Sequence, residues 1–262
     1  MPKNTQFYTI SLDELNKIIS DKLGFKVKIR NPYKLCDFKP TYGYIFEKYI
    51  KSFDFWGYSD IDVLFGNIRA HITNEVLEHH EIITTKTENL SGHFTLFRNT
   101  DLINTLFMKS PQYRNILKNK SYRGFDEKYN LTTININQNK LRYYILRIRD
   151  LIVLKAYKVF RLETKIKPDS QLDSMSKIVL YLSSSGQIRT YMKRMMETDL
   201  LLKKANSTNW QIEWNEGRIS LNERELMYFH FYYLKHDEEF KIQGLDHLNL
   251  KKFHLNPNRI EY

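Results

Sequence analysis

The sequence predicts an α/β protein with a mixed sheet, a helical insertion and a C-terminal return to the sheet. Up to about residue 138, segments with helical periodicity alternate with short apolar segments of strand character, as in layered α/β domains. Long helical patterns replace this alternation from residue 139 to 206, and strand-like patterns return from residue 207 to 262. We therefore predict three parts: an α/β core (1–138), a helical insertion (139–206) and a C-terminal segment that rejoins the core (207–262).

The predicted core begins with two helices. Residues 11–24 predict the first, because Ser11 and Glu14 form a capping box and Gly24 is a typical residue after a helix C-terminus. A second helix is expected around Pro40, which fits a first helical turn. Its apolar stripe consists of Tyr42, Ile45, Phe46 and Tyr49.

An aromatic segment follows. FDFWGYSDIDVLFGN, residues 53–67, predicts a strand of about eight residues, within the usual range of strand lengths. Its nearly continuous apolar character is typical of a strand that is covered on both faces. The remaining elements expected in the core are a helix at 67–80, strands at 81–86 and 93–99, and a helix at 100–110 that is capped by Thr100 and stops before Pro111.

The later part of the chain predicts long helices and then strands. LRYYILRIRDLIVLKAYKVFRLETK, residues 141–165, is the clearest helix, and segments 209–221 and 226–234 have strand patterns. Because basic residues alternate with aromatic ones along the helix, it could lie on an anionic membrane surface. The alternative is a helix that packs on the core and turns a solvated basic face to water.

The composition limits the environment and the partners. Lysine and arginine number 41 against 30 acidic residues, a formal charge of +11, which favours anionic partners such as nucleic acid, anionic membranes or phosphorylated substrates. A lysine-rich soluble protein explains the charge equally well. The single cysteine, Cys36, excludes a disulfide within the chain and suits a reducing cytoplasm. We see no signal peptide and no transmembrane segment.

Two carboxylates in the aromatic segment carry the main functional prediction. Asp60 and Asp62 are two residues apart, so on a strand both side chains would lie on one face. Like charges close together in an apolar setting raise each other's pKa, unless a cation lies beside them. Carboxylate oxygens suit Mg²⁺ or Mn²⁺, and such a metal can neutralise a diphosphate. In the alternative, the two residues form a turn and accept hydrogen bonds from local N–H groups.

Two other functions are possible on the same residues. Paired aspartates also occur in polymerase-β-like nucleotidyltransferases, but that family needs a Gly-Ser at a helix start before the aspartates, to hold a triphosphate. The preceding IFEKYIKSFDFWGY contains no Gly-Ser, so this reading is ranked lower. The non-enzymatic alternative is a basic protein that binds nucleic acid or membranes, with tyrosines as stacking platforms. No nucleic-acid-binding module is recognisable in the sequence, so we expect no specific nucleic-acid partner.

The chain resembles a family of bacterial glycosyltransferase-like proteins from surface-polysaccharide gene clusters, known as DUF6625. The likeness lies in four segments, PYKLCDFKPTYGYIFEKY, FWGYSDIDVLFGNI, GHFTLFRN and MYFHFYYLK. The resemblance implies a glycosyltransferase-A-type fold and transfer of a sugar from a nucleotide-diphospho-sugar, with a UDP-sugar as the expected donor. It implies a saccharide or lipid-linked saccharide as acceptor, in the synthesis of capsule, O-antigen or a similar polymer.

The resemblance also implies roles for the donor side of the site. The Asp-x-Asp of such enzymes binds the metal that bridges the diphosphate, and Asp60 and Asp62 match it. Asp62 is the stronger candidate for a direct ligand, and His230 matches a histidine that completes the metal shell. Lys235 would meet a phosphate. Asp37 and Lys39 match residues that hold the donor; alternatively they are a helix cap and an exposed lysine.

The roles implied on the acceptor side are a base and a sugar contact. Asp126 or Glu127 would deprotonate the acceptor hydroxyl, although an acidic turn is an equal alternative. Gly92 and His93 would lie where donor and acceptor sugars meet. We expect a cytoplasmic protein, peripheral on the inner face of the membrane. Relatives begin with a further strand–helix–strand unit, so we expect this chain to lack that unit, to be poorly soluble and to have uncertain activity.

Overall fold

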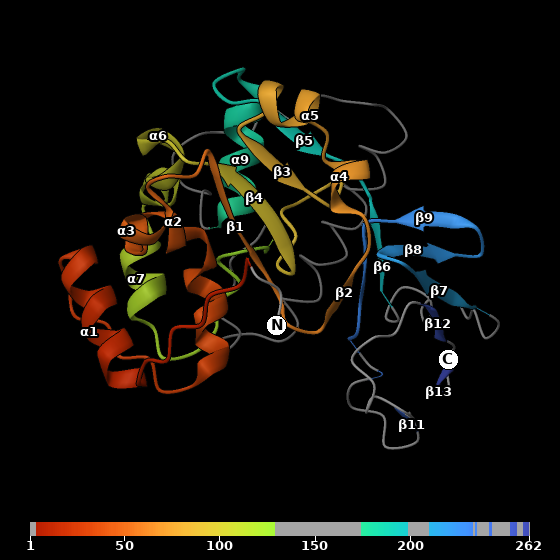
Figure 1. The fold of residues 1–262 in the computed structure, drawn as a ribbon. Coiled ribbons are helices and arrows are strands. Elements are labelled where there is room, and N and C mark those ends of the chain that lie inside the picture. Colours follow the sequence, from red (N-terminus) through yellow and green to blue (C-terminus); the bar gives the residue numbers. More distant parts are fainter. Residues whose placement is uncertain are drawn as a thin grey trace, which may run out of the picture. The chain divides into compact units, whose positions relative to one another are not determined.

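The computed structural model describes residues 4–128, 174–198, 210–232, 234, 241–242, 252–255 and 259–261 (Figure 1). The chain divides into two compact units, and each is built from two separate segments of sequence. Unit 1 comprises Met1–Tyr49 and Thr100–Gln187, and unit 2 comprises Ile50–Asn99 and Ile188–Tyr262. Helices and mixed sheets are both present, which confirms the α/β prediction at this level.

Unit 1 is helical in its described residues. Helix α1 (Leu12–Leu23) has the predicted capping box of Ser11 and Glu14, and Gly24 follows it in the left-handed conformation at φ 72°. The predicted second helix is wrong as a single element, because the chain forms a 3₁₀ helix η1 (Pro32–Thr41) and the short helices α2 (Tyr42–Ile45) and α3 (Glu47–Ile50). Pro40 lies inside η1, where its missing N–H cannot donate to an α-helical carbonyl.

The described residues of the second segment of unit 1 add α6, η2, α7 and α9. Thr100 caps α6 (Asp101–Asn104) as predicted, but the helix then tightens into the 3₁₀ helix η2 (Leu106–Lys109). Helix α7 (Tyr113–Lys118) follows Pro111, and α9 (Met175–Ser184) packs against η2. The apolar core of the unit is fully buried at Ile19, Phe38, Leu106, Phe107, Phe125 and Ile178.

The part of unit 2 that the structure describes forms three sheets. The first has the order β1-β4-β3-β5, with β1 (Phe55–Ser59), β4 (Phe94–Arg98), β3 (Ile82–Thr84) and β5 (Thr190–Met192). The second has the order β2-β10-β6, with β2 (Val63–Phe65), β10 (Tyr228–His230) and β6 (Met196–Thr198). Each contains one parallel pair, β3 with β5 and β10 with β6, so both are mixed as predicted.

The third sheet has six strands in the order β11-β13-β12-β7-β8-β9. Its strands are β7 (Ile212–Asn215), β8 (Arg218–Leu221), β9 (Arg224–Leu226), β11 (Lys241–Ile242), β12 (Lys252–Leu255) and β13 (Arg259–Glu261). The predicted strand segments 209–221 and 226–234 are therefore confirmed in part, since the first is the β7–β8 hairpin and the second contains β10.

The predicted eight-residue strand around the carboxylate pair is wrong. The chain leaves the first sheet at the end of β1, bends through Asp60, Ile61 and Asp62, and enters the second sheet as β2. Burial alternates along β1, so it is covered on one face only. Gly57 lets β1 approach β4, because a Cβ there would lie 2.5 Å from Leu96 Cδ2. The aromatic residues serve two short strands in different sheets.

Two other predicted elements differ from the structure or lie outside it. The helix expected at 67–80 is split into α4 (Ile68–His71) and α5 (Asn74–His79), because Thr73 caps a new helix by accepting from the Val76 N–H. The long basic helix at 141–165 lies outside the described residues. Of the predicted insertion at 139–206, the described part (174–198) contains α9, β5 and β6. Among the helices of the described residues, none is long and apolar enough to cross a membrane.

Candidate metal centre

Two sheet ladders hold the Asp60–Asp62 bend in unit 2. The β1–β4 ladder continues beyond β1, where the Asp60 N–H donates to the His93 carbonyl at 3.3 Å. The β2–β10 ladder continues on the other side, where the Phe231 N–H donates to the Asp62 carbonyl at 2.9 Å. Ile61 between them is fully exposed, at 104%. Each aspartate is therefore fixed through its backbone to a different sheet.

The bend places both carboxylates beside His230, the last residue of β10. One ligand atom from each of Asp60, Asp62 and His230 lies within 4.8 Å of the other two. His230 Nε2 is 3.5 Å from Asp62 Oδ1, and His230 is buried while the two aspartates are partly exposed. Two carboxylates and one imidazole are a suitable ligand set for Mn²⁺ or Mg²⁺ with water completing the shell. The family resemblance implied these three residues as ligands; they meet at a bend and not on one strand face, and metal binding by them stays a prediction.

A buried polar network lies next to this cluster. The His93 and His230 rings have centroids 4.5 Å apart and are inclined by 30°. His93 Nδ1 lies 2.7 Å from the Tyr228 hydroxyl and 3.0 Å from Ser91 Oγ, and the Tyr228 hydroxyl also meets Thr85 Oγ1. Burial raises the pKa of Tyr228 well above its ordinary value, so its hydroxyl keeps its proton. Strand alternation explains the arrangement, because Tyr228 and His230 are two apart on β10.

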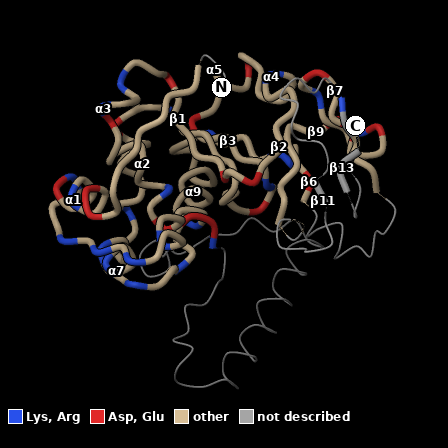
Figure 2. The backbone as a smooth tube through the Cα atoms, turned by 60° about the horizontal axis from the view of Figure 1, so that its bottom comes forward, with Lys and Arg blue, Asp and Glu red and all other residues tan. Residues whose placement is uncertain are grey.

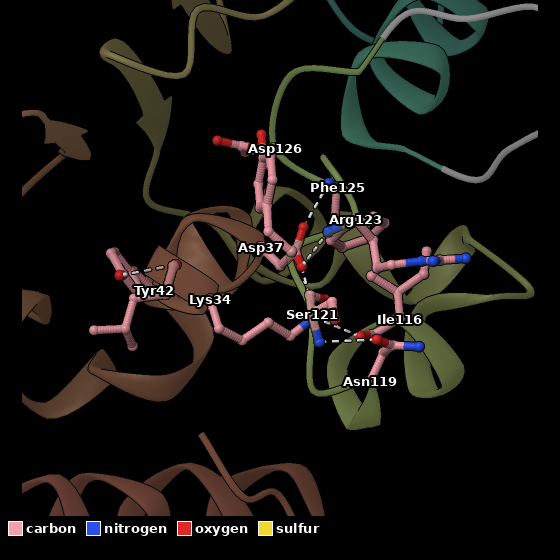
Figure 3. Close-up of polar contacts among 11 residues, drawn as sticks. Lys34, Asp37, Tyr42, Ile116, Asn119, Ser121, Arg123, Phe125 and Asp126 are labelled. Atoms are coloured by element: carbon pink, nitrogen blue, oxygen red, sulfur yellow. Dashed lines mark hydrogen bonds and ion pairs between the residues drawn. The ribbon is translucent and has the colours of Figure 1, made fainter. Parts of the chain in front are cut away.

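Asp37, a predicted donor contact, lies in unit 1 and is fully buried. Its two oxygens accept hydrogen bonds from Lys34 Nζ at 2.5 Å and from the backbone N–H groups of Arg123 and Phe125 at 2.9 and 2.8 Å (Figure 3). Lys34 also donates to the carbonyls of Ile116 and Ser121. Desolvation lowers the pKa of Lys34, against the effect of Asp37. The described contacts of Asp37 tie η1 to residues 121–125, and its contact with a donor stays a prediction.

The predicted base residues lie in the same unit. Asp126 is buried and accepts a hydrogen bond from the Tyr122 hydroxyl at 2.8 Å. Burial, followed by the charge of Glu127, raises the Asp126 pKa to about 7. Glu127 is more exposed than Asp126, and Lys39 is buried and acts electrostatically on Asp126. A carboxyl with a pKa near 7 can exchange a proton at neutral pH, and the role of Asp126 as a base stays a prediction.

The remaining predicted residues divide between the described and undescribed parts of the chain. Gly92 lies in the turn before β4, directly before His93. Lys235 lies outside the described residues. The sequence prediction did not include Tyr228, Ser91 and Thr85, although two of them could have been found: each of Tyr228 and Ser91 stands two residues before a histidine that was singled out.

Unit 1 also has a basic surface, which the net charge predicted only in general terms. Segments 22–36 and 102–125 contain no acidic residue. Exposed Lys26, Lys28 and Arg30 alternate with buried apolar residues. Arg114 and Lys118 of α7 lie over the Phe25 ring, at 5.4 and 5.1 Å from its centroid. Figure 2 shows Lys and Arg positions gathered along α7. This basic surface suits an anionic partner.

The fold and the site define a mixed α/β protein with a candidate divalent-metal centre in unit 2. Residues 1–261 match the model of a family of unknown function, DUF6625. The chain belongs to that family, as its four motif segments indicated. No curated protein and no solved structure gives a significant match.

Proposed function

We propose that this chain is a metal-dependent glycosyltransferase of the glycosyltransferase-A type. It would move a sugar from a nucleotide-diphospho-sugar to a saccharide acceptor, in the synthesis of a bacterial surface polysaccharide. The observation that carries the proposal is the convergence of Asp60, Asp62 and His230 on one point. An Asp-x-Asp with a late histidine is the ligand pattern that the family resemblance implied. His230 lies about 170 positions after the aspartates, so the fold, and not nearness in sequence, brings the three residues together.

The residues of the chain would divide the work as follows. Asp60, Asp62 and His230 would hold Mn²⁺ or Mg²⁺, which when bound neutralises the diphosphate and stabilises its departure. The two carboxylates supply the negative charge that a divalent cation requires, and the buried His230 limits water on one side of the cluster. The family resemblance implied Asp126, in unit 1, as the base for the acceptor hydroxyl, and its pKa of about 7 is suited to accepting a proton. Glu127, more open to solvent, is the alternative base.

The acceptor proposed is a saccharide, free or lipid-linked. A lipid-linked acceptor would require the protein to approach the inner face of the membrane, and the basic surface of unit 1 supports this because it carries exposed cations without acids in the same segments. The proposed membrane contact therefore rests on this basic surface and not on the predicted helix at 141–165, which lies outside the described residues.

The test is calorimetric titration of UDP, and then GDP, into the protein with and without Mn²⁺. We expect one nucleotide to bind only when Mn²⁺ is present. Asp62→Ala should abolish this binding and keep the circular dichroism spectrum of the wild type. Asp54→Ala is the matched control, because Asp54 is an exposed aspartate just before β1 and outside the ligand set.

Two outcomes contradict the proposal. One is nucleotide binding by the wild type that does not depend on Mn²⁺. The other is unchanged Mn²⁺-dependent binding in Asp62→Ala, which would remove the carboxylate pair from the site. Binding of Mn²⁺ alone, followed through the electron paramagnetic resonance signal of the free ion, tests the metal centre separately from the nucleotide.

A further inference from the structure

His93 makes three kinds of contact at the candidate metal centre. Its carbonyl accepts from the N–H of Asp60, its ring lies against the ring of His230, and its Nδ1 meets two hydroxyls. It is therefore joined to two of the three proposed ligands, yet it does not belong to the ligand set itself. The role predicted from the sequence was a sugar contact.

The two hydroxyls indicate how the ring of His93 is held. Tyr228 and Ser91 approach the same nitrogen, at 2.7 and 3.0 Å. In either tautomer Nδ1 has one bonding direction in the ring plane, through its N–H or its lone pair, and these hydroxyls lie at it. With Nδ1 engaged by Tyr228 and Ser91, the plane of the His93 ring is fixed.

The fixed ring in turn restricts His230. The centroids of the two rings are 4.5 Å apart with an inclination of 30°, and both residues are buried. A buried ring that packs on another aromatic ring cannot rotate without opening space in the core. The orientation of His230 determines whether its Nε2 faces Asp62, the neighbour at 3.5 Å. Partners that orient a metal-ligating histidine commonly affect metal affinity 10–100-fold.

We propose that His93 is a positioning residue of the metal centre: Tyr228 and Ser91 fix its imidazole, which holds the ring of His230 in the plane that binds the metal. The inference rests on the proposed function, because it requires Asp60, Asp62 and His230 to bind a divalent cation. In this proposal His93 orients a metal ligand, whereas the role predicted from the sequence was contact with a sugar.

The experiment measures Mn²⁺ affinity without any sugar or nucleotide, from the electron paramagnetic resonance signal of free Mn²⁺. We expect His93→Ala to weaken Mn²⁺ binding by about 10–100-fold. His93→Phe, which keeps a ring against His230, should restore part of the loss. His80→Ala is the matched control, because His80 also makes a ring contact, with Tyr191 at 5.2 Å, but touches no proposed ligand in the described contacts. It should bind Mn²⁺ like the wild type.

A double-mutant cycle tests the chain of contacts. Tyr228→Phe removes the hydroxyl that holds His93 and should weaken Mn²⁺ binding less than His93→Ala does. If Tyr228 acts through His93, the double variant should bind no more weakly than His93→Ala alone. Additive effects would overturn the inference. The visible spectrum of bound Co²⁺ adds a readout of geometry, and it should change in His93→Ala but not in His80→Ala.

The failure of the inference can be separated from that of the proposed function. If the wild type does not bind Mn²⁺, both are wrong. If the wild type binds Mn²⁺ and Asp62→Ala does not, but His93→Ala and Tyr228→Phe bind like the wild type, only the positioning role is wrong. Should His93→Ala fail to fold, Tyr228→Phe and Ser91→Ala, which remove one hydroxyl each, decide the question.

Discussion

Replacing Asp37 by alanine should strongly destabilise the protein. The substitution leaves the Lys34 ammonium buried without its counter-ion and removes the acceptor for the N–H groups of Arg123 and Phe125. The side chains of Lys34 and Asp37 are only 2% and 0% exposed, so water cannot replace the lost partner. Breaking a buried pair from one side costs about 3–5 kcal/mol. At about 2–4 °C per kcal/mol for domains of 150–250 residues, the melting midpoint should fall by on the order of 6–20 °C.

The assay is thermal unfolding followed by circular dichroism, with Glu47→Ala as the control. Glu47 forms an ion pair of similar length with Lys22, at 2.6 Å, but its side chain is 58% exposed. An exposed pair contributes about 0–1 kcal/mol, so this variant should melt within a few degrees of the wild type. Equal midpoints for the two variants would refute the reasoning. A normal midpoint with lost nucleotide binding in Asp37→Ala would support a donor contact instead.

Three further predictions concern pH dependence, packing and capping. The folded pKa of Asp126, about 7, lies above its ordinary 3.8. Its contribution to stability is therefore fully present below about pH 4 and is lost as the pH rises through 7. As the pH rises from 4 to 8, Asp126→Asn should therefore gain stability relative to the wild type, by up to about 4 kcal/mol. Urea unfolding of both proteins at the two pH values measures this gain. A difference in unfolding free energy between the two proteins that is the same at both pH values would contradict the burial argument. Gly66→Ala should destabilise by about 1–3 kcal/mol, because the new Cβ would lie 2.5 Å from Ile219 Cγ2, and a urea midpoint equal to that of the wild type would show that the strands move apart at no cost. Ser11→Ala should cost about 1 kcal/mol through loss of the α1 cap; Ser11→Asp should keep most of that stability, and equal losses in both variants would exclude capping as the cause.

Local signals predicted the elements that depend on local chemistry. The ends of α1 follow from Ser11, Glu14 and Gly24, whose hydrogen bonds and conformation are set within a few residues. Thr100 likewise marks the start of α6, and short apolar segments mark β3 and β4. These features need no knowledge of the rest of the chain, so the sequence alone was sufficient.

The points at which a predicted element is interrupted depend on strand partners that are remote in sequence. The apolar run from Phe55 to Phe65 looks continuous, but β1 pairs with β4 and β2 pairs with β10, about 165 residues further on. The change of sheet at Asp60–Asp62 cannot be read from a local pattern. The family resemblance nevertheless implied Asp60, Asp62 and His230 as one set of ligands, because that inference did not require the strand geometry.

The buried pair of Lys34 and Asp37 shows a different limit. Lysine and aspartate are seldom fully buried unless they are paired, so residue type alone predicts that both side chains are exposed. Their burial depends on the 116–125 segment, which supplies two carbonyls and two N–H groups. Only the folded chain brings these groups together. The sequence therefore predicted a donor contact for Asp37, and the structure adds a second role, a buried ion pair that joins two segments of unit 1.

The division into two units has a consequence for how the protein is made. Each unit consists of an early and a late segment, so the chain passes from one unit to the other at residues 49–50, 99–100 and 187–188. During synthesis from the N-terminus, the ribosome must release residue 192 before β3 can pair with β5, and residue 230 before β10 can pair with β2. Strands β2 and β3 therefore stay without these partners on the nascent chain until the later segments have been synthesised. A cut at 49–50 divides unit 1, a cut at 187–188 divides unit 2, and a cut at 99–100 divides both. Expression of one unit alone therefore requires its two segments to be joined by a designed linker.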